Sequence, residues 1–465
     1  MTTNMQPFSA LQRGHGSGHG TESVCPVCLK RIPARKIRRG DDVVLAKQCP
    51  EHGDFEAVVW RGRRPSFADW TNAKTPSYPE RPRTQVRDGC PYDCGLCPEH
   101  QQHTCTALLE ITSRCDLGCP VCFASSGEPE RSDPDPATIR GWFDRVREDG
   151  GECNVQLSGG EPTMRDDLPE IIAMGRERCF GFIQLNTNGL RLAREADYAR
   201  KLKNAGLSSV FLQFDGVRDA THLALRGRPL NSAKRRAVDN CLEAGLGVVL
   251  VPTVVPGVND EELGDILSFA LKAGPLLRGV HFQPVSYFGR YPAPPADENR
   301  ITLPEIMAAL ERQTGGMVKV EDFSPPGCEH ALCSFHGAFL RTENGDLRPA
   351  REAKRSCCGG PNRIEPHPAA EGARKSIGYT ARQWAAPSCS CATEKPSDSL
   401  SMFLEQAQTW SFSISAMVFQ DAWTLDLARL KECCIHVLSP DGRLVPFCAY
   451  NLTAADGRPL YRRRP

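Results

Sequence analysis

Three cysteines in the stretch RCDLGCPVCF could hold a reactive metal centre. Cys115, Cys119 and Cys122 stand within eight residues, in the spacing C-x3-C-x2-C. A [4Fe–4S] cluster needs one ligand for each iron, and cysteine thiolates are its usual ligands. Three local ligands leave one iron open, and an open position distinguishes a catalytic metal site from a structural one. The alternative is a zinc or electron-transfer site that takes a fourth cysteine from elsewhere in the chain.

Alternating strands and helices must position this triplet. Between Thr106 and about Val285 the hydrophobic pattern predicts six strands alternating with five helices, and many of these helices end before a glycine. Such alternation is typical of a parallel sheet with right-handed crossovers. Six units are fewer than the eight of a closed barrel. We therefore expect an α/β fold, an open partial (β/α)6 barrel, with reactive groups at the carboxyl ends of its strands.

Glycines and polar side chains follow several of these strands. The glycines of SGGEPT would let the backbone approach a ligand, and its carboxylate could meet an ammonium group. NTNG follows the third predicted strand, and VPTVVPGVND covers the fifth and the turn after it. These stretches place glycines and polar residues at the carboxyl edge of the predicted sheet.

Together these motifs resemble the signature of the radical S-adenosylmethionine (radical SAM) superfamily. The resemblance implies that Cys115, Cys119 and Cys122 hold a [4Fe–4S] cluster whose free iron binds SAM, and that reduction cleaves SAM to methionine and a 5′-deoxyadenosyl radical. It also implies roles in SAM binding for three stretches of this sequence. Gly159, Gly160 and Glu161, with Ser158 beside them, would hold the amino group, Asn186, Thr187 and Asn188 the ribose, and Val254 and Asn259 would lie near the adenine. Phe123 matches the aromatic residue that often follows the third cysteine.

A second cysteine group precedes the first strand. Cys90, Cys94, Cys97 and Cys105 have the spacing C-x3-C-x2-C-x7-C, a complete set of four for an auxiliary [4Fe–4S] cluster. A zinc knuckle is one alternative. Another is that this group, rather than Cys115–Cys122, binds SAM, but it lacks the strand and GGE turn that follow the later triplet.

Cysteines near both ends of the chain predict further metal modules. Cys25, Cys28, Cys49 and His52 have the spacing of a zinc ribbon or a rubredoxin-like iron site, and ligand type alone does not decide between zinc and iron. The C-terminal part offers ligands for another cluster. The preferred set is Cys328, Cys333, Cys433 or Cys434, and Cys448, with Cys357 and Cys358 in reserve. Residues 351–400 read as polar, Pro-rich and irregular.

Composition limits the classes of function. The 465 residues contain 22 cysteines and carry a formal net charge of +1. Without an apolar signal segment, clustered thiols indicate metal ligation in the reducing cytoplasm rather than disulfides. A neutral balance does not favour nucleic acid binding. No apolar run is long enough to cross a bilayer, which leaves peripheral membrane contact open.

A longer resemblance runs from about Cys25 to the end of the chain. GCPYDCGLCPEHQQHTCTALLEITSRCDLGCPVCFA resembles the archaeal tetraether lipid synthase group, also described as 7,8-dihydro-6-hydroxymethylpterin methyltransferase-like. The resemblance implies SAM, the SAM-binding [4Fe–4S] cluster, one or two auxiliary [4Fe–4S] clusters, and zinc or rubredoxin-type iron. The domains expected are a disordered tail (1–20), a zinc-ribbon or rubredoxin-like module (21–85), an auxiliary cluster segment (86–105), the radical SAM partial barrel (106–300) and a Cys-rich region (301–465).

The function expected from these features is radical attack on an unactivated carbon. Carbon–carbon bond formation on a lipid-like chain is favoured, and methylation of a pterin or natural-product substrate is the alternative. An external electron donor of the flavodoxin or ferredoxin kind is expected. A non-catalytic iron–sulfur electron carrier is the alternative from another class, although a carrier needs neither a barrel nor the GGE turn.

Overall fold

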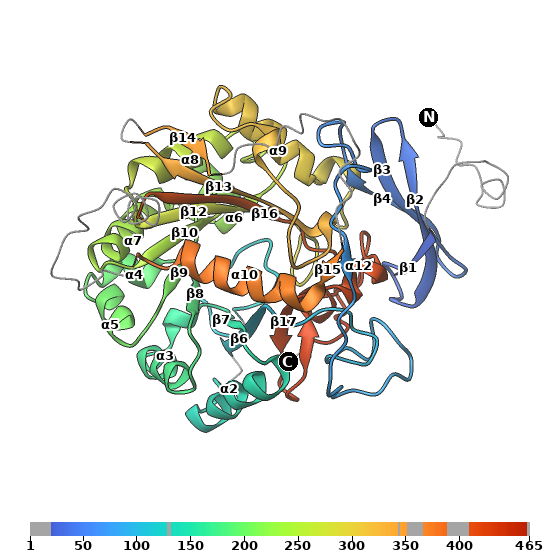
Figure 1. The fold of residues 1–465 in the computed structure, drawn as a ribbon, viewed down its shortest axis with the longest axis horizontal. Helices are drawn as coiled ribbons and strands as arrows, with labels where there is room; N and C mark the ends of the chain where they lie inside the picture. The colour runs from blue at the N-terminus through green and yellow to red at the C-terminus, as the bar shows by residue number, and fades with distance from the viewer. Residues whose placement is uncertain (1–19, 128–131, 343–344, 351–365, 388–408, 463–465) are drawn as a thin grey trace.

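A computed structural model describes residues 20–127, 132–342, 345–350, 366–387 and 409–462 of the chain. All of the tail expected at residues 1–20 except Gly20 lies outside these ranges, as do Cys357 and Cys358. A large mixed sheet forms the centre of the molecule, with helices around it and a smaller sheet at one side (Figure 1).

The six parallel strands expected from the sequence are present and adjacent in the sheet. Their order is β6-β7-β8-β9-β10-β12, and short β11 (Thr253–Val254) pairs with β12. Leu109, Val155, Leu157, Leu185 and Leu250 are fully buried on them. The strands are β6 (Thr106–Thr112), β7 (Asn154–Gly159), β8 (Ile183–Thr187), β9 (Ser209–Gln213), β10 (Gly247–Val251) and β12 (Leu277–Pro284). The α/β fold with an open set of six parallel strands is thereby confirmed.

The C-terminal part of the chain extends this sheet at both edges. β16 (Ser411–Met417) pairs in parallel with β12, and β17 (Ile435–Leu438) pairs in parallel with β6. Antiparallel strands then follow on each side, so that twelve strands make up the sheet within the described residues. These outer strands are β13 (Ser334–Arg341), β14 (Leu347–Pro349) and β18 (Leu444–Pro446).

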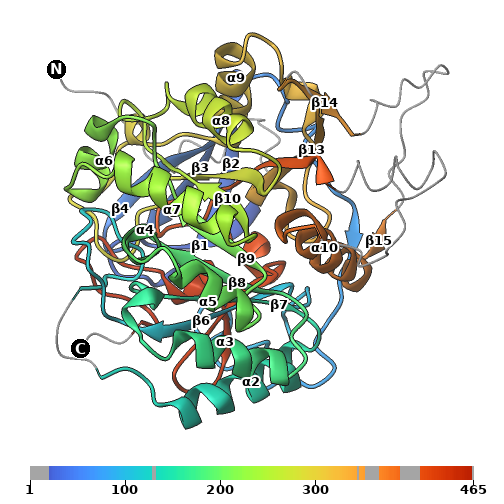
Figure 2. The same cartoon turned by 90° about the vertical axis from the view of Figure 1, so that its left-hand side faces the viewer.

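Helices α2 to α8 lie along the outside of the parallel strands, and α10 lies across one end of these strands (Figures 1 and 2). Their amphipathic faces bury residues such as Phe143 and Ile171 against the sheet. The helices are α2 (Pro136–Gly150), α3 (Leu168–Glu177), α4 (Leu190–Arg194), α5 (Tyr198–Asn204), α6 (Asp219–Arg226), α7 (Asn231–Glu243), α8 (Leu263–Lys272), α9 (Leu303–Gln313), α10 (Ala369–Trp384), α12 (Leu427–Lys431) and α13 (Phe447–Tyr450).

Helix α10 contradicts the irregular structure expected for residues 351–400. It contacts residues at which strands of the sheet begin. Asn154 Nδ2 donates to the carbonyl oxygen of Ile377 at 3.2 Å, and Arg278 Nε donates to that of Gln383 at 2.9 Å. A Cβ on Gly247 would overlap the backbone just after Trp384, so glycine is needed there. The helix therefore covers the end of the barrel opposite to the carboxyl ends of the strands.

A four-stranded antiparallel sheet forms the N-terminal module and packs on the C-terminal segment. Lys47 Nζ donates to the carbonyl oxygen of Ala422 at 2.6 Å, and Lys36 pairs with Asp426 at 2.6 Å. These buried contacts fix the module on the main sheet (Figure 1). Its strands are β1 (Gly20–Val24), β2 (Arg31–Arg39), β3 (Asp42–Cys49) and β4 (Gly53–Trp60), and β5 (Lys74–Thr75) pairs separately with β15 (His367–Pro368).

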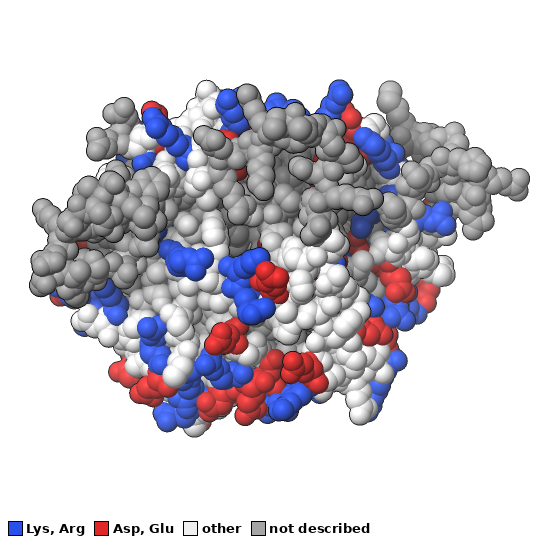
Figure 3. Space-filling model, in the orientation of Figure 1, with Lys and Arg blue, Asp and Glu red and all other residues white. Residues whose placement is uncertain are grey.

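The outer surface carries interspersed charges. On the face shown in Figure 3, acidic and basic side chains alternate over the region of α2 and α3, where Arg178 pairs with Asp144 at 2.7 Å. Among the helices of the described residues, none has the length and apolarity needed to span a bilayer.

Candidate functional site

The three cysteines of the opening motif lie in the loop after β6, and the SGGEPT turn lies directly against that loop. The N–H of Gly160 donates to the carbonyl oxygen of Thr112 at 2.8 Å, and the N–H of Glu161 donates to that of Arg114 at 2.7 Å. A Cβ on Gly160 would overlap the carbonyl oxygen of Arg114. The glycine is required because the two backbones approach so closely.

Glu161 ties the ends of three neighbouring strands together. It is 1% exposed, and its carboxylate accepts hydrogen bonds from Thr163, from Thr187 Oγ1 at 2.6 Å and from the N–H of Asn188 at 2.6 Å. Burial raises the pKa of Glu161 against the lowering effect of these donors. Glu161 lines the cavity described below, and its expected contact with an ammonium group remains a prediction.

Asn186 and Asn188 differ in how the protein uses them. Asn188 Nδ2 donates to Asp116 at 2.7 Å, linking the end of β8 to the cysteine loop. Asn186 Nδ2 donates to Gln156 Oε1 at 3.4 Å, and Gln156 Nε2 donates to Gln184 at 2.6 Å. This amide chain leaves Asn186 Oδ1 buried without a hydrogen-bond partner among the described residues. A buried acceptor of this kind calls for a donor on a ligand.

Val254 and Asn259 do not line the cavity, which differs from the expectation for the fifth strand. Val254 is fully buried in the core. Asn259 is 1% exposed, and its Nδ2 donates to the carbonyl oxygens of Asp215 and Thr253. These hydrogen bonds shape the turn after β10 because they satisfy its backbone. Thr253 lies on the cavity wall in their place.

A buried charge cluster behind the cysteines was not predicted. The guanidinium of Arg226 contacts the thiol of Cys119 and pairs with Asp215 at 2.6 Å. Burial would raise the pKa of Asp215, but the charge of Arg226 holds it below its usual range. Lys234 Nζ donates to the carbonyl oxygen of Asn188 at 2.6 Å. The sequence does not indicate these residues, because a single Arg or Lys on a helix has no distinctive spacing.

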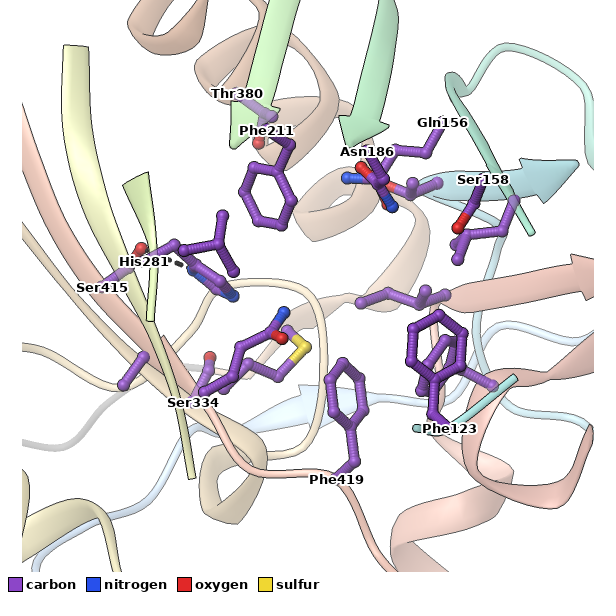
Figure 4. Close-up of a pocket in the computed structure, with 18 of the residues that line it drawn as sticks. Phe123, Gln156, Ser158, Asn186, Phe211, His281, Ser334, Thr380, Ser415 and Phe419 are labelled. Atoms are coloured by element: carbon purple, nitrogen blue, oxygen red, sulfur yellow. Dashed lines mark hydrogen bonds between the residues drawn. The ribbon is translucent and has the colours of Figure 1, made fainter. Parts of the chain in front are cut away.

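One cavity of about 830 Å³ connects these parts of the site. Its lining includes the cysteine loop, residues of the parallel strands and residues of α10. Figure 4 shows Phe211 and His281 on one side of it, Gln156, Asn186 and Ser158 on another, and Phe123 and Phe419 at one end. The predicted residues on its lining are Cys115, Cys119, Cys122, Phe123, Ser158, Gly159, Gly160, Glu161, Asn186, Thr187 and Asn188.

The predicted four-cysteine set at residues 90–105 is divided in the structure. Cys105 does not join the other three; its thiol lies within 4.8 Å of those of Cys328 and Cys434, and it is paired with Cys328 as a disulfide. The reason is strand pairing. Cys105 immediately precedes β6 and its N–H donates to the carbonyl oxygen of Cys434 at 2.8 Å, next to β17. Cys105 and Cys434 both face the cavity.

The remaining cysteines of this set stay together. Cys90, Cys94 and Cys97 line a small second cavity together with His100 and Lys431. A hydrogen bond to the Cys94 thiol lowers the pKa of Cys90 against the effect of burial. These three cysteines thus surround one small cavity that Cys105 does not line.

The preferred C-terminal set is divided as well. Cys328 and Cys434 lie with Cys105, whereas Cys333, Cys433 and Cys448 lie near one another. Arg429 donates to the Cys333 thiol at 3.4 Å, and the N–H of Gln420 donates to the Cys448 thiol at 3.2 Å.

The four predicted ligands of the N-terminal module are brought together. The ligand atoms of Cys25, Cys28, Cys49 and His52 all lie within 4.8 Å of one another. His52 Nδ1 is 3.6 Å from the Cys25 thiol and 3.4 Å from the Cys49 thiol. Three thiols and one imidazole at this spacing suit a single tetrahedral metal ion.

The residues at the carboxyl ends of the strands fit a cluster and SAM. Three thiols share one loop on the cavity wall, and that number suits a [4Fe–4S] cluster with one open iron. Gly159 and Gly160 lie against the backbone of Thr112 and Arg114, which holds the turn and the cysteine loop side by side on the cavity wall. The unpartnered Oδ1 of Asn186 could accept a hydrogen bond from a ribose hydroxyl.

Comparisons with known proteins find the same cofactor class that the residues at the strand ends suit. Residues 109–270 match the radical SAM superfamily, and residues 19–61 match the HMPTM N-terminal zinc ribbon domain. The chain is 34% identical to the 7,8-dihydro-6-hydroxymethylpterin dimethyltransferase of Methanocaldococcus jannaschii, an alignment covering 93% of each protein. It is 31% identical to the GTP 3′,8-cyclase of Nautilia profundicola, over 37% of this chain and 55% of that protein.

Among solved structures, Streptococcus suis SuiB bound to S-adenosylmethionine aligns with a TM-score of 0.36 and 14% identity, over 46% of this chain and 47% of that one. Two findings determine the family of the chain: the similarity to the Methanocaldococcus jannaschii protein over 93% of each chain, and the match at residues 109–270. The protein therefore belongs to the radical SAM enzymes, in the same family as the pterin dimethyltransferase of Methanocaldococcus jannaschii.

Proposed function

We propose that this enzyme functionalises an unactivated carbon of a pterin-class small molecule, with methylation as the outcome. The observation that carries the proposal is the cavity of about 830 Å³, which joins the three-cysteine loop to a chamber lined by the amide side chains of Gln156, Asn186, Gln213 and Gln283. The name of the archaeal relative supports the same substrate class.

The residues of the loop and the strand ends would prepare the reaction. Cys115, Cys119 and Cys122 would hold the cluster, and Arg226 would stabilise the thiolate of Cys119 through its positive charge. Gly159 and Gly160 would leave room for SAM, with Glu161, Asn186 and Asn188 around it. When bound and reduced, the cluster and SAM supply a carbon radical that can take hydrogen from an unactivated carbon.

The amide groups of the chamber favour a pterin over a lipid chain. A pterin presents several ring donors and acceptors, whereas an isoprenoid chain would leave an amide such as that of Gln283 without a partner. Each such unpaired group costs about 1–3 kcal/mol. Apolar side chains line much of the rest of the cavity, and aromatic ones gather at one end of it.

That apolar end supports carbon–carbon bond formation on a lipid-like chain as a second candidate. Phe123, Phe288, Phe419 and Phe447 form a packed aromatic cluster there, with Phe419 and Phe447 ring centroids 4.4 Å apart. These rings line the cavity beside Cys122. A chain end could lie against them, and this feature also leaves peripheral membrane contact open.

The other cysteine groups would hold further metals. We infer one mononuclear zinc or rubredoxin-type iron at Cys25, Cys28, Cys49 and His52, and one or two auxiliary [4Fe–4S] clusters among the other groups. In their reduced state Cys105, Cys328 and Cys434 would place such a cluster on the wall of the substrate chamber. An external flavodoxin or ferredoxin-like donor would supply electrons, and the thiol-rich composition fits the reducing cytoplasm.

The test is turnover by the reconstituted, reduced protein with SAM. One SAM would yield the radical that takes the hydrogen, and a second SAM, with a further electron from the reductant, would supply the methyl group. With 7,8-dihydro-6-hydroxymethylpterin and excess SAM we therefore expect 5′-deoxyadenosine and S-adenosylhomocysteine together with a pterin in which one or two hydrogens are replaced by methyl groups, measured by mass spectrometry. Cleavage of SAM with an unchanged pterin would contradict the substrate proposal. A parallel reaction with an isoprenoid glycerophospholipid tests the second candidate, which predicts loss of two hydrogens on coupling of chain ends.

A further inference from the structure

The wall of the chamber midway between the cysteine loop and α10 is built around one histidine. His281 lies on β12 and is 7% exposed. Its Nδ1 is 2.8 Å from Ser415 Oγ on the paired strand β16, where the two residues are in register. Within the described residues Nε2 makes no hydrogen bond, and the ring lines the cavity (Figure 4).

Two aromatic residues complete this wall. The ring centroid of Phe211 is 5.3 Å from that of His281, and Trp384 is 5.4 Å from Phe211 and 5.8 Å from His281. Trp384 is the last residue of α10, and its Nε1 donates to Ser413 Oγ at 3.1 Å. A Cβ on Gly279 would overlap Ser413, so this glycine lets β12 and β16 approach closely enough to seat both serines.

The wall is neutral. Burial lowers the pKa of His281 to about 4, so the imidazole is uncharged near neutral pH. Helix α10 contributes two charged residues to the lining of the cavity, Lys375 and Arg382. Lys375 pairs with Glu371 at 2.6 Å and is largely exposed. Gln283, also on β12, lines the same chamber, and its side-chain amide makes no hydrogen bond within the described residues. Aromatic faces with a neutral imidazole and a free amide suit a flat, uncharged nitrogen heterocycle.

Resting on the proposed function, we propose that Phe211, His281 and Trp384 form the binding wall for the substrate ring, with His281 Nε2 hydrogen-bonded to a ring heteroatom. Ser415 is a positioning residue, since its hydroxyl decides which way the imidazole is protonated. The aromatic rings flank the heterocycle, and α10 thereby selects the substrate. The ligand class is a pterin-like ring rather than a phosphate or an acyl chain.

The experiment measures equilibrium binding of 7,8-dihydro-6-hydroxymethylpterin to the full-length, reconstituted protein with SAM present, under anaerobic conditions. Four variants are compared with wild type: His281→Asn, His281→Gln, Trp384→Leu and Arg374→Ala. A glutamine amide can reach the position of Nε2, whereas an asparagine amide reaches only that of Nδ1. Arg374 is exposed on α10 and does not line the cavity, so it is the matched control.

We expect His281→Asn and Trp384→Leu to raise the dissociation constant about tenfold or more, His281→Gln to raise it less than His281→Asn, and Arg374→Ala to stay within about twofold of wild type. Binding of SAM to each variant reports whether its fold is intact. Wild-type affinity in both His281→Asn and Trp384→Leu overturns the inference. Wild type that fails to bind or convert the pterin overturns the proposed function instead, so the two failures are distinguishable.

Discussion

The N–H of Glu161 donates to the carbonyl oxygen of Arg114 at 2.7 Å, so the SGGEPT turn and the cysteine loop form one hydrogen-bonded unit. This bond joins residues that are 47 positions apart in the sequence, so the two motifs are coupled through the backbone. A disturbance at the glycines is expected to reach the thiols directly.

Gly160→Ala tests this coupling. The new Cβ would overlap the carbonyl oxygen of Arg114, a backbone atom that cannot turn away as a side chain would. We expect SAM binding to weaken at least about tenfold, equivalent to about 1.4 kcal/mol, as measured by calorimetry on reconstituted protein. Gly141→Ala, at an exposed position of α2 with open space around it, is the control and should bind SAM normally. Equal affinities for both variants would show that the close approach is unimportant.

Substitutions distinguish the triplet at Cys115–Cys122 from the triplet at Cys90–Cys97 by their effects on SAM cleavage. Cys119→Ala removes one of three cluster ligands beside Arg226, so no 5′-deoxyadenosine should form above background. Cys94→Ala alters a group outside the main cavity and should still allow cleavage without substrate turnover. Chromatography of the reduced reaction mixture measures both. The reverse pattern would place the catalytic cluster at Cys90–Cys97.

The grouping of Cys105 with Cys434 predicts a pattern of iron loss. Because these thiols would serve the same site, the double variant Cys105→Ala/Cys434→Ala should lose about as much iron as either single variant. The double variant Cys94→Ala/Cys105→Ala should lose the sum of its two single losses, because the sites are separate. Iron analysis and Mössbauer spectroscopy give the quantities. Additive loss in the first pair and shared loss in the second would restore the four-cysteine set of residues 90–105.

The buried ion pair of Arg300 and Asp421 predicts a pH-dependent stability. Arg300 NH1 lies 2.8 Å from Asp421 Oδ2, and Asp421 is fully buried. Asp421→Asn should lower the free energy of unfolding by about 3 kcal/mol or more, because a buried guanidinium loses its partner. Glu321→Gln, which removes the partner of exposed Arg64, should cost less than about 1 kcal/mol. Thermal unfolding at neutral pH measures both effects.

The ion pair of Arg300 and Asp421 also determines how its contribution to stability changes with pH. Burial would raise the pKa of Asp421, but the charge of Arg300 and the surrounding hydrogen bonds hold it below its usual range. A carboxyl with a lowered folded-state pKa contributes stability above its unfolded pKa of about 4. That contribution is lost as the pH falls through the folded-state pKa. The difference in unfolding midpoint between wild type and Asp421→Asn should therefore shrink as the pH falls from 5 to 3, and a constant difference would contradict this assignment.

Local patterns predicted the central sheet and the residues at its carboxyl edge. Strand β7 and the SGGEPT turn were readable because the apolar run and the glycines are contiguous. The fourfold group Cys25, Cys28, Cys49 and His52 was readable because its spacing is short and familiar.

Pairing between distant segments could not be read in the same way. Nothing near Cys105 indicates that its neighbour in the sheet is Cys434, since that depends on β6 pairing with β17. Helix α10 was missed because its inward residues Ala373, Ile377 and Trp384 form only a short apolar stripe within a polar, Pro-rich stretch of sequence. The sequence predicts that Asn259 contacts a ligand, because it does not show that the side-chain amide donates to backbone carbonyl oxygens near its own turn.

The pairing of β6 with β17 also affects how the chain is made. The strand that leads into the three-cysteine loop receives its outer neighbour from residues 435–438, more than 300 residues later in synthesis. Until those residues leave the ribosome, β6 is an unprotected sheet edge of the kind that recruits foreign strands. Protection of the strand that precedes the cysteine loop therefore waits for the last part of the chain to be made.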